Sequence, residues 1–161
     1  MCRDMYSENS SVTSGLVTGT MWDATMKFIT TDSTSYSDLK STTWGNYNSN
    51  TGLEYTQGRG RYITVSSSNG AVTSVATVSD GSYHYGIRTT AFSEGIKRKN
   101  IYDLAGNLWE WTQEAVSATN NILRGGSFRY NYSGNPVSYR HSLNATTNNT
   151  DLGFRPALYI R

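Results

Sequence analysis

The chain has 161 residues, a length that fits one folded domain built around one hydrophobic core. Its formal net charge is only +2 and its basic clusters are short, which argues against a nucleic-acid-binding protein, because such proteins contact many phosphates from one face. No run approaches the ~20 apolar residues of a membrane helix and no secretory leader pattern opens the chain, so we expect a soluble protein without a membrane partner. The single cysteine, Cys2, excludes an internal disulfide.

The first predicted element is a helix within residues 15–31. Apolar residues recur there near the helical period, and Thr20 with Asp23 three positions later resembles a capping box. These apolar residues are Met21, Trp22, Met26 and Ile29. Residues 31–60 follow as a Ser-, Thr- and Asn-rich segment without periodicity, which we interpret as a long loop kept ordered by Trp44.

Three strands are predicted next, at residues 61–66, 71–79 and 83–92, because β-branched and aromatic residues alternate there with polar ones. The dipeptides Asn69-Gly70 and Asp80-Gly81 separate the three runs and are strong hairpin signals. The pattern therefore predicts an antiparallel meander.

Three further apolar stretches follow in the C-terminal part. Residues 100–112 are interrupted by a Gly-Asn pair, residues 121–128 hold a short strand, and residues 152–160 have the pattern of one strand. Pro156 places that last strand at a sheet edge or a bulge, because proline cannot donate a hydrogen bond to the ladder.

Short motifs stand among these elements in a fixed order. They are LVT and WD at residues 16–18 and 22–23, WGN at 44–46, YDLAGNLWEWT at 102–112, RGGS at 124–127 and GFR at 153–155. Together they resemble the formylglycine-generating-enzyme family, also called the sulfatase-modifying-factor family. The resemblance implies a mixed α+β fold of the C-type-lectin-like kind, rich in loops, with short antiparallel strands and one or two helices.

The resemblance runs from about Cys2 to Arg155, and we expect a single domain over residues 1–161, but the region that the family carries before the first motif is missing. The chain is therefore either a fragment of a longer protein or a shortened form of the fold. Because the first and last strands of the family lie near one another, the shortening is expected to expose a sheet edge. We expect compensation by homo-oligomerisation or by local repacking.

The polar residues of the motifs have two interpretations. Family members bind calcium at the segment that matches residues 106–110, so the resemblance implies a structural calcium ion held by Asn107 and Glu110, with no other cofactor required. Alternatively, Asn107 caps a turn and Glu110 pairs with an arginine. The arginines that we expect to act as struts for loop carbonyls and carboxylates are Arg124, Arg140 and Arg155.

The catalytic chemistry of the family is absent from this sequence. Catalytic members use two cysteines between the RGGS and GFR motifs to bind copper and to perform an oxidation, and residues 128–152 contain none. Cys2 lies far upstream and is interpreted as a small buried hydrophobe, and the two histidines, His84 and His141, lack metal-ligand spacing. We expect a protein that is not an enzyme. The alternative is a formylglycine-generating-enzyme-like oxidoreductase or an accessory subunit of one.

Residues 128–150 have the composition of a binding surface. Tyrosine offers a large contact area and Asn and Ser offer adaptable hydrogen bonds, as in antibody paratopes, although a solvated loop has a similar composition. The resemblance favours binding, because relatives with this fold include the variable proteins of diversity-generating retroelements, in which this region is diversified. We expect a protein or glycan ligand and a module at a bacterial cell surface, secreted, or on a phage particle. The predicted contact residues are Arg129, Tyr130, Asn131, Tyr132, Asn135, Tyr139, His141 and Asn144.

Overall fold

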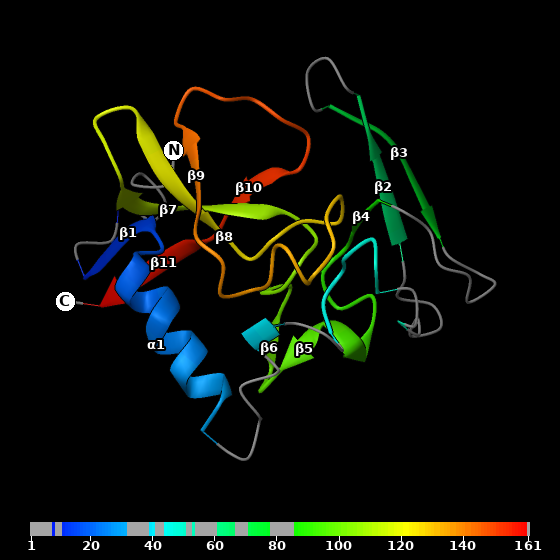
Figure 1. Ribbon diagram of the computed structural model, residues 1–161, viewed down its shortest axis with the longest axis horizontal. Coiled ribbons are helices and arrows are strands. Elements are labelled where there is room, and N and C mark those ends of the chain that lie inside the picture. The colour runs from blue at the N-terminus through cyan, green and yellow to red at the C-terminus, as the bar shows by residue number, and fades with distance from the viewer. Residues whose placement is uncertain are drawn as a thin grey trace.

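The computed structural model describes residues 8, 11–31, 39–40, 44–50, 53, 61–66, 71–77 and 86–160. Within these ranges, one α-helix and eleven short strands are joined by long connections (Figure 1). This arrangement confirms the predicted α+β class with its loop-rich, mostly antiparallel architecture. The same described part of the chain contains no helix that is long and apolar enough to cross a membrane.

Helix α1 covers Gly19–Ile29 and packs one apolar stripe into the core. The stripe consists of Trp22, Met26 and Ile29. The predicted capping box is wrong: Thr18, not Thr20, caps the helix, and its Oγ1 accepts a hydrogen bond from the Met21 N–H at 3.1 Å. The helix begins at Gly19 and not at residue 15, because β-strand residues precede Thr18 and the extended backbone ends there.

The first and last described strands pair with each other. Strand β1 (Val12–Leu16) runs antiparallel to β11 (Pro156–Ile160) in a two-stranded sheet. Pro156 therefore begins an edge strand, as its missing N–H predicts. The single C-terminal strand predicted from the sequence is instead two strands, because β10 (Leu152–Phe154) ends before Arg155 and pairs with a different sheet.

A four-stranded sheet forms the centre of the molecule, in the order β10-β7-β8-β9. The strands not yet introduced are β7 (Trp109–Ala115), β8 (Asn120–Arg124) and β9 (His141–Asn144). β10 is parallel to β7, and the other pairs are antiparallel. The β7–β8 register shifts at a bulge, where the buried Thr112 Oγ1 donates to the Ile122 carbonyl and accepts from the Glu114 N–H.

A separate three-stranded sheet corrects the predicted meander (Figure 1). Its strands are β2 (Arg61–Val65), β3 (Val72–Thr77) and β4 (Ile87–Arg88). β2 and β3 pair as a hairpin, but β4 pairs with β2 and not with β3. The Asn107 side chain fixes β4 in this place, since it accepts from the Arg88 N–H at 2.8 Å and donates to the Arg88 carbonyl at 3.2 Å. Both predicted hairpin dipeptides lie outside the described residues.

A short hairpin divides the apolar stretch that was predicted at residues 100–112. It follows the 3₁₀-helix η3 (Glu94–Ile96) and consists of β5 (Lys97–Arg98) and β6 (Ile101–Tyr102). Its two turn residues, Lys99 and Asn100, have φ angles of 47° and 64°, as tight two-residue hairpins require. The apolar residues of β6 therefore belong to a different sheet from those of β7.

The sequence motifs meet in the core. Trp44 and Tyr47 are fully buried, and the Tyr47 hydroxyl donates to the Gly125 carbonyl at 2.7 Å. Asn46 forms a parallel bridge with Gly106, whose φ is 70° and where a Cβ atom would collide with the Asn46 carbonyl. The WGN, GN and RGGS motifs therefore form a scaffold that carries the more exposed segments.

Candidate binding site

Residues 128–150, predicted to be a binding surface, cross the outside of this scaffold (Figure 1). The start of the segment is held through its backbone. The Asn48 N–H donates to the Tyr130 carbonyl at 3.1 Å, and Asn48 Nδ2 donates to the Arg129 carbonyl at 2.8 Å. The Ser49 Oγ accepts from the Tyr132 N–H at 3.2 Å. The polar residues after the WGN motif therefore set where the tyrosines project.

The middle of the segment is held by contacts of the same kind. Trp22 Nε1 of α1 donates to the Val137 carbonyl at 3.2 Å, and Arg124 Nη1 of β8 donates to the Ser138 carbonyl at 2.8 Å. Val137 is fully buried, whereas the neighbouring Tyr139 is exposed. The backbone of the segment is thus fixed at residues 137–138, and exposed side chains lie before and after these two residues.

Arg124 is the centre of an ion-pair network below the segment. Its guanidinium pairs with Glu114 at 3.1 Å and with Asp23 of α1, and Glu114 also pairs with Arg140. The Arg124 side chain is 2% exposed and that of Glu114 is 12% exposed, so this pair is largely removed from water, whereas Asp23 and Arg140 are more than half exposed. The contacts confirm the predicted role of these arginines as struts.

Three of the predicted contact residues converge on Trp109. The centroid of its ring system lies 5.2 Å from the stacked ring of His141, 6.1 Å from Tyr130 and 6.2 Å from Tyr139. Tyr139 also stacks on His141 at 6.2 Å. Trp109 is 2% exposed, whereas each tyrosine is 42% exposed. A buried indole thus supports an exposed group of rings, and we call Trp109, Tyr130, Tyr139 and His141 the aromatic surface.

Other predicted contact residues do not join the aromatic surface. Tyr132 is half-buried, and its ring meets that of Tyr47 edge-on at 6.4 Å. The Oδ1 atoms of Asn131 and Asn144 accept hydrogen bonds from backbone N–H groups three and two residues further on, so these side chains stabilise turns. Asn135 is half-buried. Arg129 is exposed and directly precedes Tyr130 in the chain.

Two parts of this site were not predicted from the sequence. Trp109 lies inside the YDLAGNLWEWT motif, where an indole fits the role of core filling, and no local pattern links it to residues 130–141. The anchors Asn48 and Ser49 were also missed. The polar residues directly after the WGN motif were the signal for these anchors, but they were interpreted only as part of a long loop.

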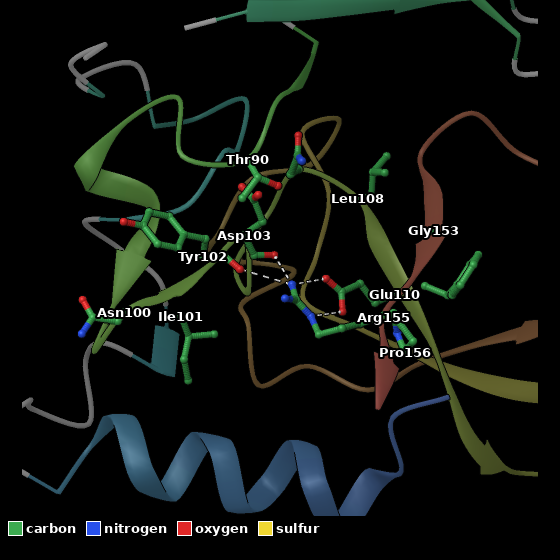
Figure 2. A pocket seen from close by; sticks show the side chains of 12 residues that line it. Thr90, Asn100, Ile101, Tyr102, Asp103, Leu108, Glu110, Gly153, Arg155 and Pro156 are labelled. Carbon is green, nitrogen blue, oxygen red and sulfur yellow. Dashed lines mark hydrogen bonds and ion pairs between the residues drawn. The ribbon is translucent and has the colours of Figure 1, made fainter. Parts of the chain in front are cut away.

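A pocket of about 590 Å³ is lined by Glu110, Arg155 and Asp103, among other residues. Figure 2 shows these three side chains close together. Successive side chains of a strand point to opposite faces, so Glu110 and its neighbour Trp109 belong to different sides of β7. Within the pocket, Arg155 Nε and Nη2 donate to the two carboxylate oxygens of Glu110 at 3.0 and 2.7 Å. Arg155 Nη2 also donates to the carbonyls of Tyr102 and Asp103 at 3.3 and 3.2 Å. Glu110 therefore pairs with an arginine, as the second interpretation of the motif predicted, and this pairing explains why the chain turns at Arg155.

Burial changes the protonation equilibria of the two carboxyl groups in this pocket. It raises the pKa of Glu110, and the Arg155 guanidinium opposes that rise. Burial also raises the pKa of Asp103, whose ionised form the Thr90 hydroxyl stabilises. Asp103 Oδ1 is buried, and none of the described residues donates a hydrogen bond to it. The pocket therefore holds a carboxylate oxygen that the described residues leave unused.

These contacts decide which residues fit a calcium ion. Asn107 Oδ1 accepts from Asn46 Nδ2 at 3.1 Å and from the Arg88 N–H at 2.8 Å, so both of its lone pairs are engaged. Glu110 lines the pocket, and Asp103 adds the unused oxygen. In the part of the chain that the structure describes, no three Asp, Glu, His or Cys side chains gather as a metal site. Calcium at Asn107 and Glu110 stays a prediction; both oxygens of Glu110 accept from Arg155, so Asp103 is the side chain of the pocket with an oxygen left for the ion.

Calcium is expected to raise the melting temperature of the wild-type chain but not that of Asp103→Asn. A ligand of the folded state stabilises it by about 1.4 kcal/mol at ten times its Kd. Asparagine is the matched replacement, because it tolerates the φ of 55° at this position and lacks only the charge. Thermal unfolding in EDTA and in excess calcium chloride tests this. Equal shifts in both proteins, or none in the wild type, contradict it.

Comparison with known proteins agrees with the motifs. Residues 41–160 match the family described as the sulfatase-modifying factor enzyme 1-like domain. The chain therefore belongs to the sulfatase-modifying factor family. A solved structure with a similar fold is that of Treponema denticola variable protein 1, at a TM-score of 0.54 and 20% sequence identity over 92% of this chain and 48% of that chain. No curated protein matches the chain.

The match to the sulfatase-modifying factor family covers the WGN, YDLAGNLWEWT, RGGS and GFR motifs, which the structure brings together in the core and around the pocket. The resemblance inferred from the motifs is thus confirmed, and the likeness to the Treponema protein confirms the fold. The chain spans about half the length of that Treponema protein.

Proposed function

We propose that this member of the sulfatase-modifying factor family is a non-catalytic binding module that holds a macromolecular ligand on the aromatic surface. The observation that carries the proposal is the exposure of two tyrosines on a buried indole. Tyrosine and tryptophan dominate the energetics of binding surfaces, because they bury a large area at a small cost in side-chain entropy. Rings that already pack against each other lose still less freedom when a ligand binds.

Two further features support a binding role. Tyr130, Tyr139 and His141 of the aromatic surface lie on a segment whose backbone is anchored at residues 129–130, 132 and 137–138, so these side chains are presented from a fixed frame. Between the RGGS and GFR motifs, where the catalytic relatives implied by the resemblance carry cysteines, this chain has tyrosine, asparagine and serine. These side chains suit recognition, and they do not supply an oxidisable thiol.

Replacing both Tyr130 and Tyr139 by alanine is expected to weaken ligand binding by at least about 100-fold, since hot-spot residues contribute about 2 kcal/mol or more each. The ligand for this test is found by screening the immobilised chain against a panel of proteins and glycans, and its affinity is then measured by titration. Both side chains are 42% exposed but pack on Trp109, so the double variant is expected to fold with a modestly lower melting temperature.

Tyr159→Ala is the matched control, because Tyr159 is a tyrosine of similar exposure, 38%, on β11 in a different sheet. Its variant is expected to bind like the wild type. A ligand whose binding tolerates the Tyr130 and Tyr139 replacements but not that of Tyr159 places the binding site elsewhere and refutes the proposal.

A further inference from the structure

Arg129 is an exposed cation at the edge of the aromatic surface, next to Tyr130 in the chain. Its guanidinium lies 5.6 Å from the centroid of the Phe128 ring and donates a hydrogen bond to the Thr150 hydroxyl. Phe128 is 6% exposed, so the ring below the guanidinium is fixed in the protein. Among the described residues, no carboxylate forms an ion pair with Arg129. The arginine is therefore held in place while its charge is unmatched within those residues.

Within its own segment, no acidic side chain compensates the charge of Arg129. Residues 128–150 contain no Asp or Glu, and their cationic side chains are those of Arg129 and Arg140. The carboxylates closest to the segment are engaged or covered: Glu114 is held by two arginines, and Asp151 is 1% exposed and accepts from the Ser127 hydroxyl at 2.8 Å. The exposed side of the segment thus combines aromatic rings and amides with positive charge.

We infer, on the basis of the proposed function, that the ligand of the aromatic surface is an acidic polypeptide segment whose carboxylate binds Arg129 while its apolar side chains contact Tyr130 and Tyr139. A planar guanidinium holds a carboxylate through two parallel hydrogen bonds, which gives geometric specificity as well as attraction. Because the Phe128 and Thr150 contacts already restrict the Arg129 side chain, less conformational freedom is lost when the carboxylate arrives.

An exposed amide next to the segment favours a polypeptide over an acidic glycan. The Asn48 side chain is exposed, and its Nδ2 atom and the Asn48 N–H bind the carbonyls of Arg129 and Tyr130. The Asn48 Oδ1 atom suits a hydrogen bond to the extended backbone of a peptide that reaches Arg129.

A selection from a random peptide library on the immobilised wild-type chain tests the inference. We expect the recovered peptides to be enriched in Asp or Glu next to aromatic residues or proline. For a recovered peptide, Arg129→Gln is expected to weaken binding about tenfold, and the same loss is expected when the acidic residue of the peptide is replaced by its amide. Lys27→Gln, which removes an exposed lysine from α1, is the charge-matched control and is expected to leave the affinity unchanged. Raising the salt concentration weakens the wild-type complex more than the Arg129→Gln complex.

The outcomes separate this inference from the proposed function. Peptides that need Tyr130 and Tyr139 but bind Arg129→Gln with wild-type affinity leave the proposed function standing and overturn the acidic ligand. Neutral or basic consensus peptides overturn it as well, and so does an acidic glycan that binds where no peptide does. Peptides that bind the double tyrosine variant unchanged refute the proposed function itself.

Discussion

Trp109→Ala is expected to abolish ligand binding and to lower the free energy of unfolding by about 3–5 kcal/mol. The indole is 2% exposed and contacts three rings of the aromatic surface, so its removal leaves a cavity directly beneath them. The rings then lose the support that holds Tyr130 and Tyr139 in one arrangement. Chemical denaturation gives the stability, and titration with the selected ligand gives the affinity.

Trp109→Phe separates the two effects. Phenylalanine keeps a ring under His141 and is expected to recover most of the lost stability and a measurable part of the affinity, because the cavity is smaller. Trp111→Ala is the positional control, since Trp111 is half-buried and lies two residues further along the same strand. If Trp109→Ala binds with wild-type affinity, the aromatic surface is not the ligand site.

Arg124→Met is expected to cost about 3 kcal/mol of folding stability, because it removes the buried partner of Glu114 and leaves that carboxylate with the exposed Arg140 alone. The variant loses the contact with Glu114 at 3.1 Å and the hydrogen bond to the Ser138 carbonyl at 2.8 Å. The same change is expected to loosen the centre of the segment next to Tyr139. Urea denaturation measures the stability, and amide hydrogen exchange at residues 137–141 reports the local opening.

Asp23→Asn provides the comparison within the same network. The Asp23 side chain is 58% exposed, and exposed ion pairs contribute about 0–1 kcal/mol, so this variant is expected to differ little from the wild type. Equal destabilisation by the two substitutions contradicts the assignment of Arg124 as the buried centre of the network.

Local pattern was enough to predict several features of the fold. The helical period of Trp22, Met26 and Ile29 marked the buried face of α1, and alternation marked the β2–β3 hairpin. The motifs identified the family, because they combine buried aromatic residues with glycines such as Gly106, which the close approach of the backbone at Asn46 requires. The helical period, the strand alternation and the motifs are each formed by residues that are close in sequence, so they can be recognised without knowledge of the fold.

The features that escaped prediction depend on contacts between distant residues. β4 pairs with β2 because Asn107, far along the chain, binds the backbone of Arg88. The C-terminal apolar run divides because Arg155 turns to Glu110. In the site, three predicted contact residues meet on Trp109, whereas two predicted asparagines serve local turns, and composition alone does not separate those roles.

Three of the hydrogen bonds that anchor residues 128–150 end on main-chain carbonyl groups, and their donors are Trp22, Asn48 and Arg124, all outside the segment. Every amino acid brings an equivalent carbonyl, so an exchange of exposed side chains within the segment leaves these three bonds available. The side chains proposed to contact a ligand and these anchoring atoms are consequently different parts of the same stretch of chain.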